Sequence, residues 1–167
     1  MFSIGDTVMY GADGVCRIVD ITTLDLTGSD ESYYVLTPES ENGSKIFVPT
    51  ENSALTERIQ PLLSKDEIME LVANVKPCEP FWSENSGERR QRYSEAVKGG
   101  DRGVLIAMIR ELYAKRSGLS GKRKRFSVTD EKYYKLAQKI LYDEFSRVIP
   151  MKFDDLVPFV CKTAAET

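Results

Sequence analysis

The stretch TVMYGADGVCRIVDI, residues 7–21, decides how the N-terminal part of the chain folds. Residues 7–10 have an extended character, and the two glycines Gly11 and Gly14 suit the tight turn that follows. Residues 15–21 then alternate apolar and polar side chains, as a half-buried strand does. The stretch therefore predicts two short strands joined by a tight turn.

Further short strands follow at similar spacing. The runs at 33–36 and 45–49 are rich in β-branched and aromatic residues, and Asn42 and Gly43 between them are typical of a hairpin turn. Four to five short strands separated by turns predict a small β-barrel similar to an SH3 or Tudor fold, over residues 1–60.

From Ser64 the apolar period changes to that of helices. Ser64 and Glu67 have the spacing of a capping box ahead of an amphipathic helix, and Pro77 is expected to end that helix. Gly118 is expected to end a later one. The later helices are predicted at 88–98, 101–117, from Ser127 or Thr129 to 148, and 154–162. The chain is therefore predicted to be an α+β protein with two domains, a barrel at 1–60 and an all-α domain at 64–163.

The 167 residues include no histidine, and this absence narrows the function classes. It removes the commonest general base, the commonest metal ligand and every Ser-His or Cys-His pair. The cysteines Cys16, Cys78 and Cys161 lack C-x-x-C spacing and fit a reducing cytosol better than a disulfide framework. With no apolar run of membrane-spanning length and no Gly-rich phosphate loop, we expect a cytoplasmic non-enzyme without metal or cofactor.

Charge is distributed unevenly along the chain. Residues 1–60 hold three basic and ten acidic side chains, a net charge of −7. Residues 86–147 hold sixteen basic and eight acidic ones, a net charge of +8. An acidic half joined to a basic half indicates two modules with different partners, although chance surface composition would give the same pattern.

The basic side chains of the helical half are its main chemical signal. Clusters of this kind favour phosphates, because each neutralised phosphate releases counterions. A solvated surface loop explains the run before the longest helix equally well. The candidate cations are Arg89, Arg90 and Arg92 on one predicted helix and Lys122, Arg123, Lys124 and Arg125 in that loop.

Trp82 is the only tryptophan, and it follows a Pro-flanked connector instead of lying in a periodic apolar stripe. An exposed aromatic at this place could insert between base steps in a DNA minor groove. Alternatively, Phe81 and Trp82 pack between helices as part of the core.

Aromatic residues on the predicted strands suggest a partner surface. Tyr33 and Tyr34 are neighbours on one strand, so their side chains point to opposite faces. We therefore expect that they cannot both be buried in a small barrel, and that one of them contacts a partner. Strand addition at an exposed edge is a further possibility for such a barrel.

Ordered motifs along the chain resemble the bacterial CarD/CdnL family. The resemblance covers about residues 1–149, and its N-terminal module is similar to the RNA-polymerase-interacting domain of the transcription-repair coupling factor. The matching stretches are residues 2–10, 14–15, 34–36 and 46–49 in the first half, and 92–93, 98–101, 109–113 and 136–141 in the second.

The resemblance implies a transcription regulator without a sequence code of its own. A Tudor-like barrel would bind the β subunit of RNA polymerase, and the helical domain would stabilise the promoter open complex by minor-groove and phosphate contacts. Leu24 and Phe47 occupy the positions where the family tends to have basic polymerase contacts. The implied polymerase contacts are Tyr34, Lys45, Phe47 and Pro49, and the implied DNA contacts are Trp82 and the seven cations named above.

An alternative reading keeps the polymerase-binding barrel and gives the helical domain a second protein to bind in place of DNA. The position of Trp82 discriminates between the two. If its ring packs between helices, away from the cations, the DNA interpretation weakens.

Overall fold

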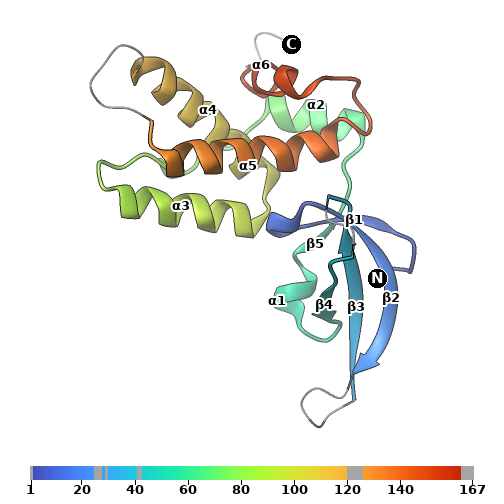
Figure 1. The fold of residues 1–167 in the computed structure, drawn as a ribbon. Coiled ribbons are helices and arrows are strands. Elements are labelled where there is room, and N and C mark those ends of the chain that lie inside the picture. Colours follow the sequence, from blue (N-terminus) through green and yellow to red (C-terminus); the bar gives the residue numbers. More distant parts are fainter. Residues whose placement is uncertain (1, 25–27, 29, 41–42, 120–125, 163–167) are drawn as a thin grey trace. The chain divides into compact units, whose positions relative to one another are not determined.

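A computed structural model describes residues 2–24, 28, 30–40, 43–119 and 126–162 (Figure 1). The chain divides into two compact units, which we call the N-terminal unit, residues 1–62, and the helical unit, residues 63–167. No helix among the described residues is both long and apolar enough to cross a membrane.

The N-terminal unit is built on a five-stranded antiparallel sheet. Along the sheet the strands follow the order β4-β3-β2-β1-β5. The strands are β1 (Thr7–Tyr10), β2 (Val15–Leu24), β3 (Glu31–Pro38), β4 (Ile46–Pro49) and β5 (Ile59–Pro61). The predicted strands at 7–10, 15–21, 33–36 and 45–49 are thus confirmed, and β2 extends three residues beyond its predicted end.

The sheet stays open, since β4 and β5 are its two edges and do not pair in the described part of the chain. The predicted barrel is therefore observed only as a five-stranded antiparallel sheet. The sequence did not foresee the short helix α1 (Ser53–Thr56), which contacts β4, or β5. Elements this short carry too little periodicity to be recognised.

The turn between β1 and β2 depends on its glycines. Gly11–Asp13 form a single 3₁₀ turn, η1, and Gly14 follows with φ of +72°. That backbone conformation is left-handed and is readily adopted only by glycine. The Tyr10 N–H donates to the Gly14 carbonyl at 2.9 Å, which closes the turn.

The expectation that Tyr33 and Tyr34 cannot both be buried is wrong, because their exposed fractions are 6% and 8%. Tyr34 belongs to the apolar core and meets the edge of the Phe2 ring, with ring centroids 6.3 Å apart. Tyr33 points to the other face, where it lies between Thr22 of β2 and Pro49 of β4 in the ladder. Both faces of β3 are therefore covered at this point, which strand alternation alone does not reveal.

The described residues of the helical unit form six helical segments. They are α2 (Lys65–Ala73), α3 (Ser86–Gly99), α4 (Arg102–Leu119), α5 (Val128–Phe145), the 3₁₀ turn η2 (Phe153–Asp155) and α6 (Leu156–Val160). The capping box at Ser64 is confirmed, and of the two candidate caps of α5 it is Ser127 that caps the helix.

Two predicted helix ends are wrong. The first helix, α2, ends at Ala73, where the Asn74 side chain donates to the Glu70 carbonyl at 3.0 Å, so Pro77 is not what ends it. Gly118 lies inside α4 instead of beyond its end. A glycine inside a helix costs only about 1 kcal/mol relative to alanine, so packing along the rest of α4 outweighs it.

The core of the helical unit lies around α4 and α5, which contact each other and the remaining helices. On these two helices Val104, Tyr133 and Leu136 are half-buried. The buried side chains include Leu105, Met108, Ile109, Leu112, Ala137, Ile140, Leu141 and Phe145.

A buried ion pair ties the start of the helical unit to its core. Arg102 of α4 and Glu144 of α5 are joined by two hydrogen bonds of 2.9 and 2.7 Å, and both are almost fully buried. The same carboxylate accepts the Leu63 N–H at 2.9 Å. Three donors thus satisfy Glu144, as a buried charge requires.

Replacing Glu144 by glutamine should destabilise the helical unit by about 3–5 kcal/mol, because the Arg102 guanidinium would stay buried without its countercharge. Urea unfolding of Glu144→Gln against the unaltered protein measures this. Glu95→Gln, at an exposed position of α3, is the matched control and should change the free energy of unfolding by no more than about 0.5 kcal/mol. Equal stability of the two variants would contradict the role given to Glu144.

Candidate functional site

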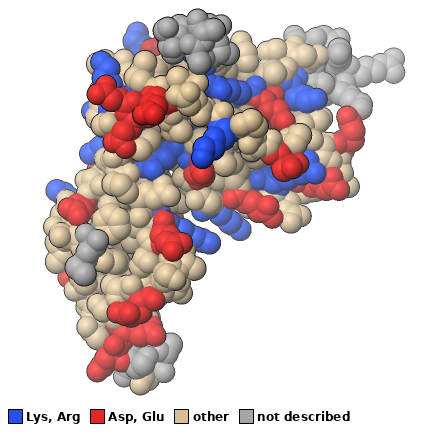
Figure 2. All heavy atoms as spheres, turned by 180° about the vertical axis from the view of Figure 1, so that it is seen from behind, with Lys and Arg blue, Asp and Glu red and all other residues tan. Residues whose placement is uncertain are grey.

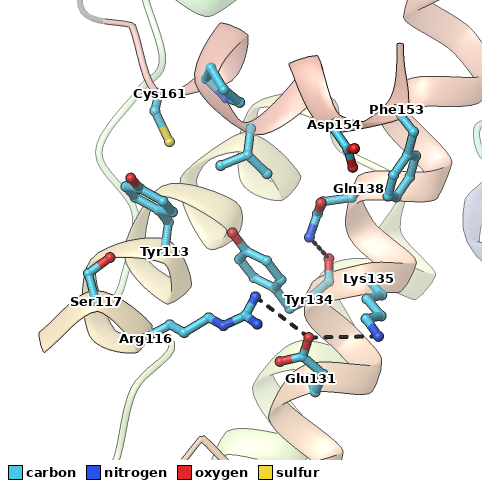
Figure 3. Close-up of a pocket in the computed structure, with 12 residues that line it drawn as sticks. Tyr113, Arg116, Ser117, Glu131, Tyr134, Lys135, Gln138, Phe153, Asp154 and Cys161 are labelled. Atoms are coloured by element: carbon cyan, nitrogen blue, oxygen red, sulfur yellow. Dashed lines mark hydrogen bonds and ion pairs between the residues drawn. The ribbon is translucent and has the colours of Figure 1, made fainter. Parts of the chain in front are cut away.

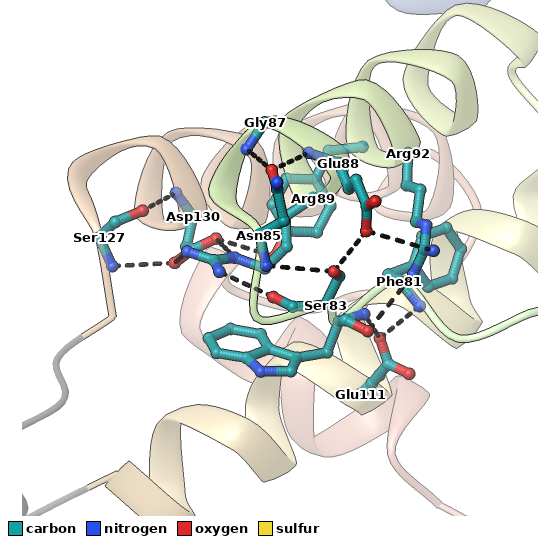
Figure 4. Close-up of polar contacts among 12 residues, drawn as sticks. Phe81, Ser83, Asn85, Gly87, Glu88, Arg89, Arg92, Glu111, Ser127 and Asp130 are labelled. Atoms are coloured by element: carbon teal, nitrogen blue, oxygen red, sulfur yellow. Dashed lines mark hydrogen bonds and ion pairs between the residues drawn. The ribbon is translucent and has the colours of Figure 1, made fainter.

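The connector between α2 and α3 carries Trp82, and a single carboxylate fixes its backbone from one side. Glu111 of α4 accepts the N–H groups of both Phe81 and Trp82 through Oε2, at 2.8 and 2.9 Å (Figure 4). Hydrogen bonds to an ionised acceptor are roughly twice as strong as neutral ones. Phe81 is buried at this point, so the connector is anchored immediately before the tryptophan.

Two arginines of α3 hold the same connector through its carbonyl groups. Arg92 donates through Nη1 to the carbonyls of Pro80 and Trp82 at 3.1 and 3.4 Å. Arg89 donates through Nη1 to the Ser83 carbonyl at 2.8 Å. The N–H and C=O groups around Trp82 are therefore held by α4 and α3 respectively.

The Trp82 ring is half-buried and lies among cations and one other aromatic ring. The Arg89 guanidinium carbon is 4.4 Å from the ring centroid, and the Lys115 ammonium of α4 is 5.6 Å away. The Phe126 ring stacks nearly parallel to it, with centroids 6.4 Å apart and an interplanar angle of 12°. Both cation distances fall within the range of a cation–π attraction.

Arg89 is itself locked in place by Asp130, the third residue of α5. The guanidinium donates through Nε and Nη2 to the two Asp130 oxygens, at 3.0 and 3.3 Å. The Tyr93 hydroxyl donates to the same carboxylate at 2.8 Å, and so does the Ser127 N–H at 2.9 Å. Arg89 and Asp130 are 9% and 1% exposed, so the pair is screened from water.

The electrostatics of this network favour a charged Asp130. Burial by itself would raise the pKa of its carboxyl, but hydrogen bonds from Arg89, Ser127 and Tyr93 outweigh burial and hold the pKa below its ordinary value. For Tyr93, burial and the hydrogen bond to Asp130 raise the pKa of the phenol. At neutral pH the network therefore consists of a carboxylate, a guanidinium and a neutral phenol.

The predicted DNA-contacting residues occupy different environments. Trp82 is half-buried, Arg90 is exposed on α3, and the Arg92 side chain is 42% exposed. Arg89 is buried and paired, so its position favours a role in holding Trp82, and its predicted DNA contact stays untested. Lys122, Arg123, Lys124 and Arg125 lie outside the described residues.

Several residues of this site were not identified from the sequence. Trp82 is contacted by Glu111 and Lys115 of α4 and by Phe126, the residue before the N-cap of α5. Nothing in the local spacing of these three residues predicts that they lie near Trp82. Asp130 entered the sequence analysis only as one of the eight acidic side chains at 86–147. Its position three residues after Ser127 was the available signal, because a carboxylate there completes a capping box.

The predicted polymerase contacts of the N-terminal unit also differ in exposure. Tyr34 is in the core, Pro49 is half-buried, Lys45 is exposed, and the Phe47 side chain on β4 is 45% exposed. Because β4 is an edge strand, it pairs on one side only, with Val35 opposite Phe47. Figure 2 shows acidic side chains gathered on this unit, and both signs of charge over the helices.

Residues 2–63 match the family model described as CarD-like/TRCF RID domain. The match spans all five strands of the N-terminal unit and stops before α2. Comparison with curated proteins finds no match. The helical unit is thus characterised by its own residues alone.

Replacing Asp130 by asparagine should destabilise the helical unit by about 3–5 kcal/mol at neutral pH, because Arg89 would be left buried and unpaired. The pKa of Asp130 is lowered in the folded state. Its contribution is therefore fully present above the ordinary carboxyl pKa of about 4 and is lost as pH falls through the lowered value. Urea unfolding at neutral and acid pH measures this. The free energies of unfolding of Asp130→Asn and of the unaltered protein should differ at neutral pH and become equal at strongly acid pH.

Tyr93→Phe is the graded control for this experiment. It removes one hydrogen bond from the same carboxylate and leaves the ion pair, so it should cost only about 1 kcal/mol. A constant difference between Asp130→Asn and the unaltered protein down to strongly acid pH would contradict the assigned role of the carboxylate.

Proposed function

We propose that this CarD-like protein binds RNA polymerase through its N-terminal domain and stabilises the promoter open complex through DNA contacts of its helical unit. The observation that carries the proposal is the match of residues 2–63 to a CarD-like/TRCF RID domain, a type of domain associated with RNA polymerase in transcription. The proposal assigns no catalytic step to the chain, which acts by binding and works in the cytoplasm.

For the polymerase contact, the proposal uses the edge strand β4 and names the β subunit as partner. Phe47 offers an exposed apolar side chain on that strand, and Lys45 just before it offers a cation. An edge strand also presents backbone groups that can pair with a strand of another protein. The N-terminal unit is acidic overall, so apolar and backbone contacts are favoured over a basic patch.

For the DNA contact, the proposal uses the exposed part of the Trp82 ring and the cations next to it. Lys115 is exposed and close to the ring, and Arg92 is partly exposed beside the connector. An aromatic side chain can insert between base steps, while neighbouring cations neutralise phosphates. Phosphate contacts carry no sequence code, so binding should tolerate many sequences.

A second candidate is a protein-only adaptor in which the helical unit binds another protein. The observation that favours it is the internal use of Arg89, which removes one predicted cation from the surface, together with the half-buried state of Trp82. Polymerase capture without affinity for DNA would select this candidate.

Phe47→Ala should weaken capture of RNA polymerase by about tenfold or more, since truncating a central aromatic contact commonly costs over 1 kcal/mol of binding free energy. Pull-down with the full chain, followed by identification of the retained subunit, measures this. Val148→Ala removes an exposed apolar side chain from the helical unit and is the matched control. Failure of the unaltered chain to retain the β subunit would overturn the proposed partner.

Lys115→Ala should weaken binding to duplex DNA, and by a similar factor for unrelated sequences. It should also reduce the slope of log affinity against log salt concentration by about the amount expected for one phosphate contact. Fluorescence anisotropy with two unrelated duplexes over a range of salt concentrations measures both quantities. Lys139→Ala removes a positive charge at an exposed position of α5 and is the matched control. It should weaken DNA binding less than Lys115→Ala does. Equal effects of the two variants would contradict a DNA site centred on Trp82.

A further inference from the structure

A pocket of about 740 Å³ lies in the helical unit, apart from the surroundings of Trp82 described above. Its walls come from the C-terminal half of α4, the middle of α5, and the η2–α6 segment (Figure 3). This volume falls within the range of small-molecule sites, about 300–1,000 Å³. The proposed function makes no use of the pocket.

An accessible hydroxyl on an otherwise buried tyrosine opens into this pocket. Tyr134 of α5 is 4% exposed, and its hydroxyl makes no hydrogen bond to any described residue. Figure 3 shows the hydroxyl directed into the pocket. Burial, reinforced by nearby Cys161, raises the pKa of Tyr134 to about 12, so the group is a neutral phenol in the physiological range. The hydroxyl oxygen is therefore free to accept a hydrogen bond from an occupant of the pocket.

Gln138, one turn further along α5, contributes an acceptor with a defined direction. Its Nε2 donates to the Tyr134 carbonyl at 3.2 Å, which fixes the orientation of the amide. The amide oxygen therefore points the other way, toward the Asp154 carboxylate in Figure 3. Gln138 is 7% exposed, and no described residue donates to this oxygen.

Two acceptors thus face each other across this end of the pocket. Asp154 of η2 is exposed and has no ion pair or hydrogen bond within the described part of the chain. The two cations of the pocket, Arg116 and Lys135, both pair with Glu131, which also lines it, at 3.6 and 3.8 Å. An occupant between Gln138 and Asp154 must therefore supply hydrogen-bond donors, and a positive charge would complement the carboxylate.

The remaining wall next to these acceptors is apolar. Phe153, Val157 and Tyr113 line the same pocket, and the Phe153 and Tyr113 side chains are 39% and 49% exposed. Aliphatic carbons pack well against such a surface, and an ammonium group is attracted to aromatic faces. The pocket thus combines oxygen acceptors at one end with an apolar wall.

We propose that this pocket binds a primary alkylammonium group. The head would donate to the Asp154 carboxylate, the Gln138 amide oxygen and the Tyr134 hydroxyl, and the aliphatic stem would lie against Phe153 and Val157. Such a group occurs in free aliphatic amines and in lysine side chains of other proteins, and both sources present the same chemistry.

The test is a titration of the full chain with n-pentylamine, followed by backbone and side-chain amide chemical shifts. Saturable shifts should concentrate at Tyr134, Gln138 and Asp154. The isosteric alcohol n-pentanol lacks the charge and should bind at least about tenfold more weakly, because a charge-assisted hydrogen bond is lost. A second arm replaces the amine with a Gly-Lys-Gly peptide blocked at both ends, and with the same peptide acetylated on lysine.

Asp154→Asn should weaken binding of the amine by about tenfold or more. Glu70→Gln, which removes an exposed charge from α2 outside the pocket, is the matched control. Saturation by the amine alone supports a free amine as ligand, and tighter binding of the unacetylated peptide supports a lysine side chain. Absence of saturable shifts in both arms overturns the proposal, and so does an equal response of the Asp154→Asn and Glu70→Gln variants.

Discussion

The helical unit depends above all on the buried carboxylate of Asp130. It accepts hydrogen bonds from Arg89 and Tyr93 of α3 and from the N-cap of α5, so one group joins two helices and starts one of them. Because Arg89 also holds the Ser83 carbonyl and lies against the indole of Trp82, the position of the tryptophan follows from the same charge. A buried ion pair of this kind stabilises the fold only while both partners are present.

Local signals in the sequence were sufficient for most elements, because caps, turns and apolar periods act over a few residues. The capping box at Ser64 is of this kind. Burial of Tyr33 could not be predicted in this way, since it depends on what covers the second face of the sheet. Gly118 likewise falls inside α4, since the cost of one glycine in a helix is only about 1 kcal/mol.

The candidate site was harder to predict than the fold, for a related reason. A count of charges treats every arginine as available, yet Arg89 is paired with a residue 41 positions away. Lys115 contributes to the surroundings of Trp82 from a helix that the basic pattern did not single out. Pairing and proximity over such distances are set by tertiary structure, so Trp82 could be recognised as unusual but its neighbours could not be named.

The hydrogen bond from Leu63 to Glu144 bears on how the two units work together. The last strand of the N-terminal unit ends at Pro61, and the chain is already fixed to the helical core at Leu63. The tether between the units is therefore very short. When one module is bound, a short tether holds the other at a high effective concentration, in the millimolar range for short flexible linkers. If both units bind as proposed, binding of the N-terminal unit therefore raises the effective concentration of the helical unit at its own partner.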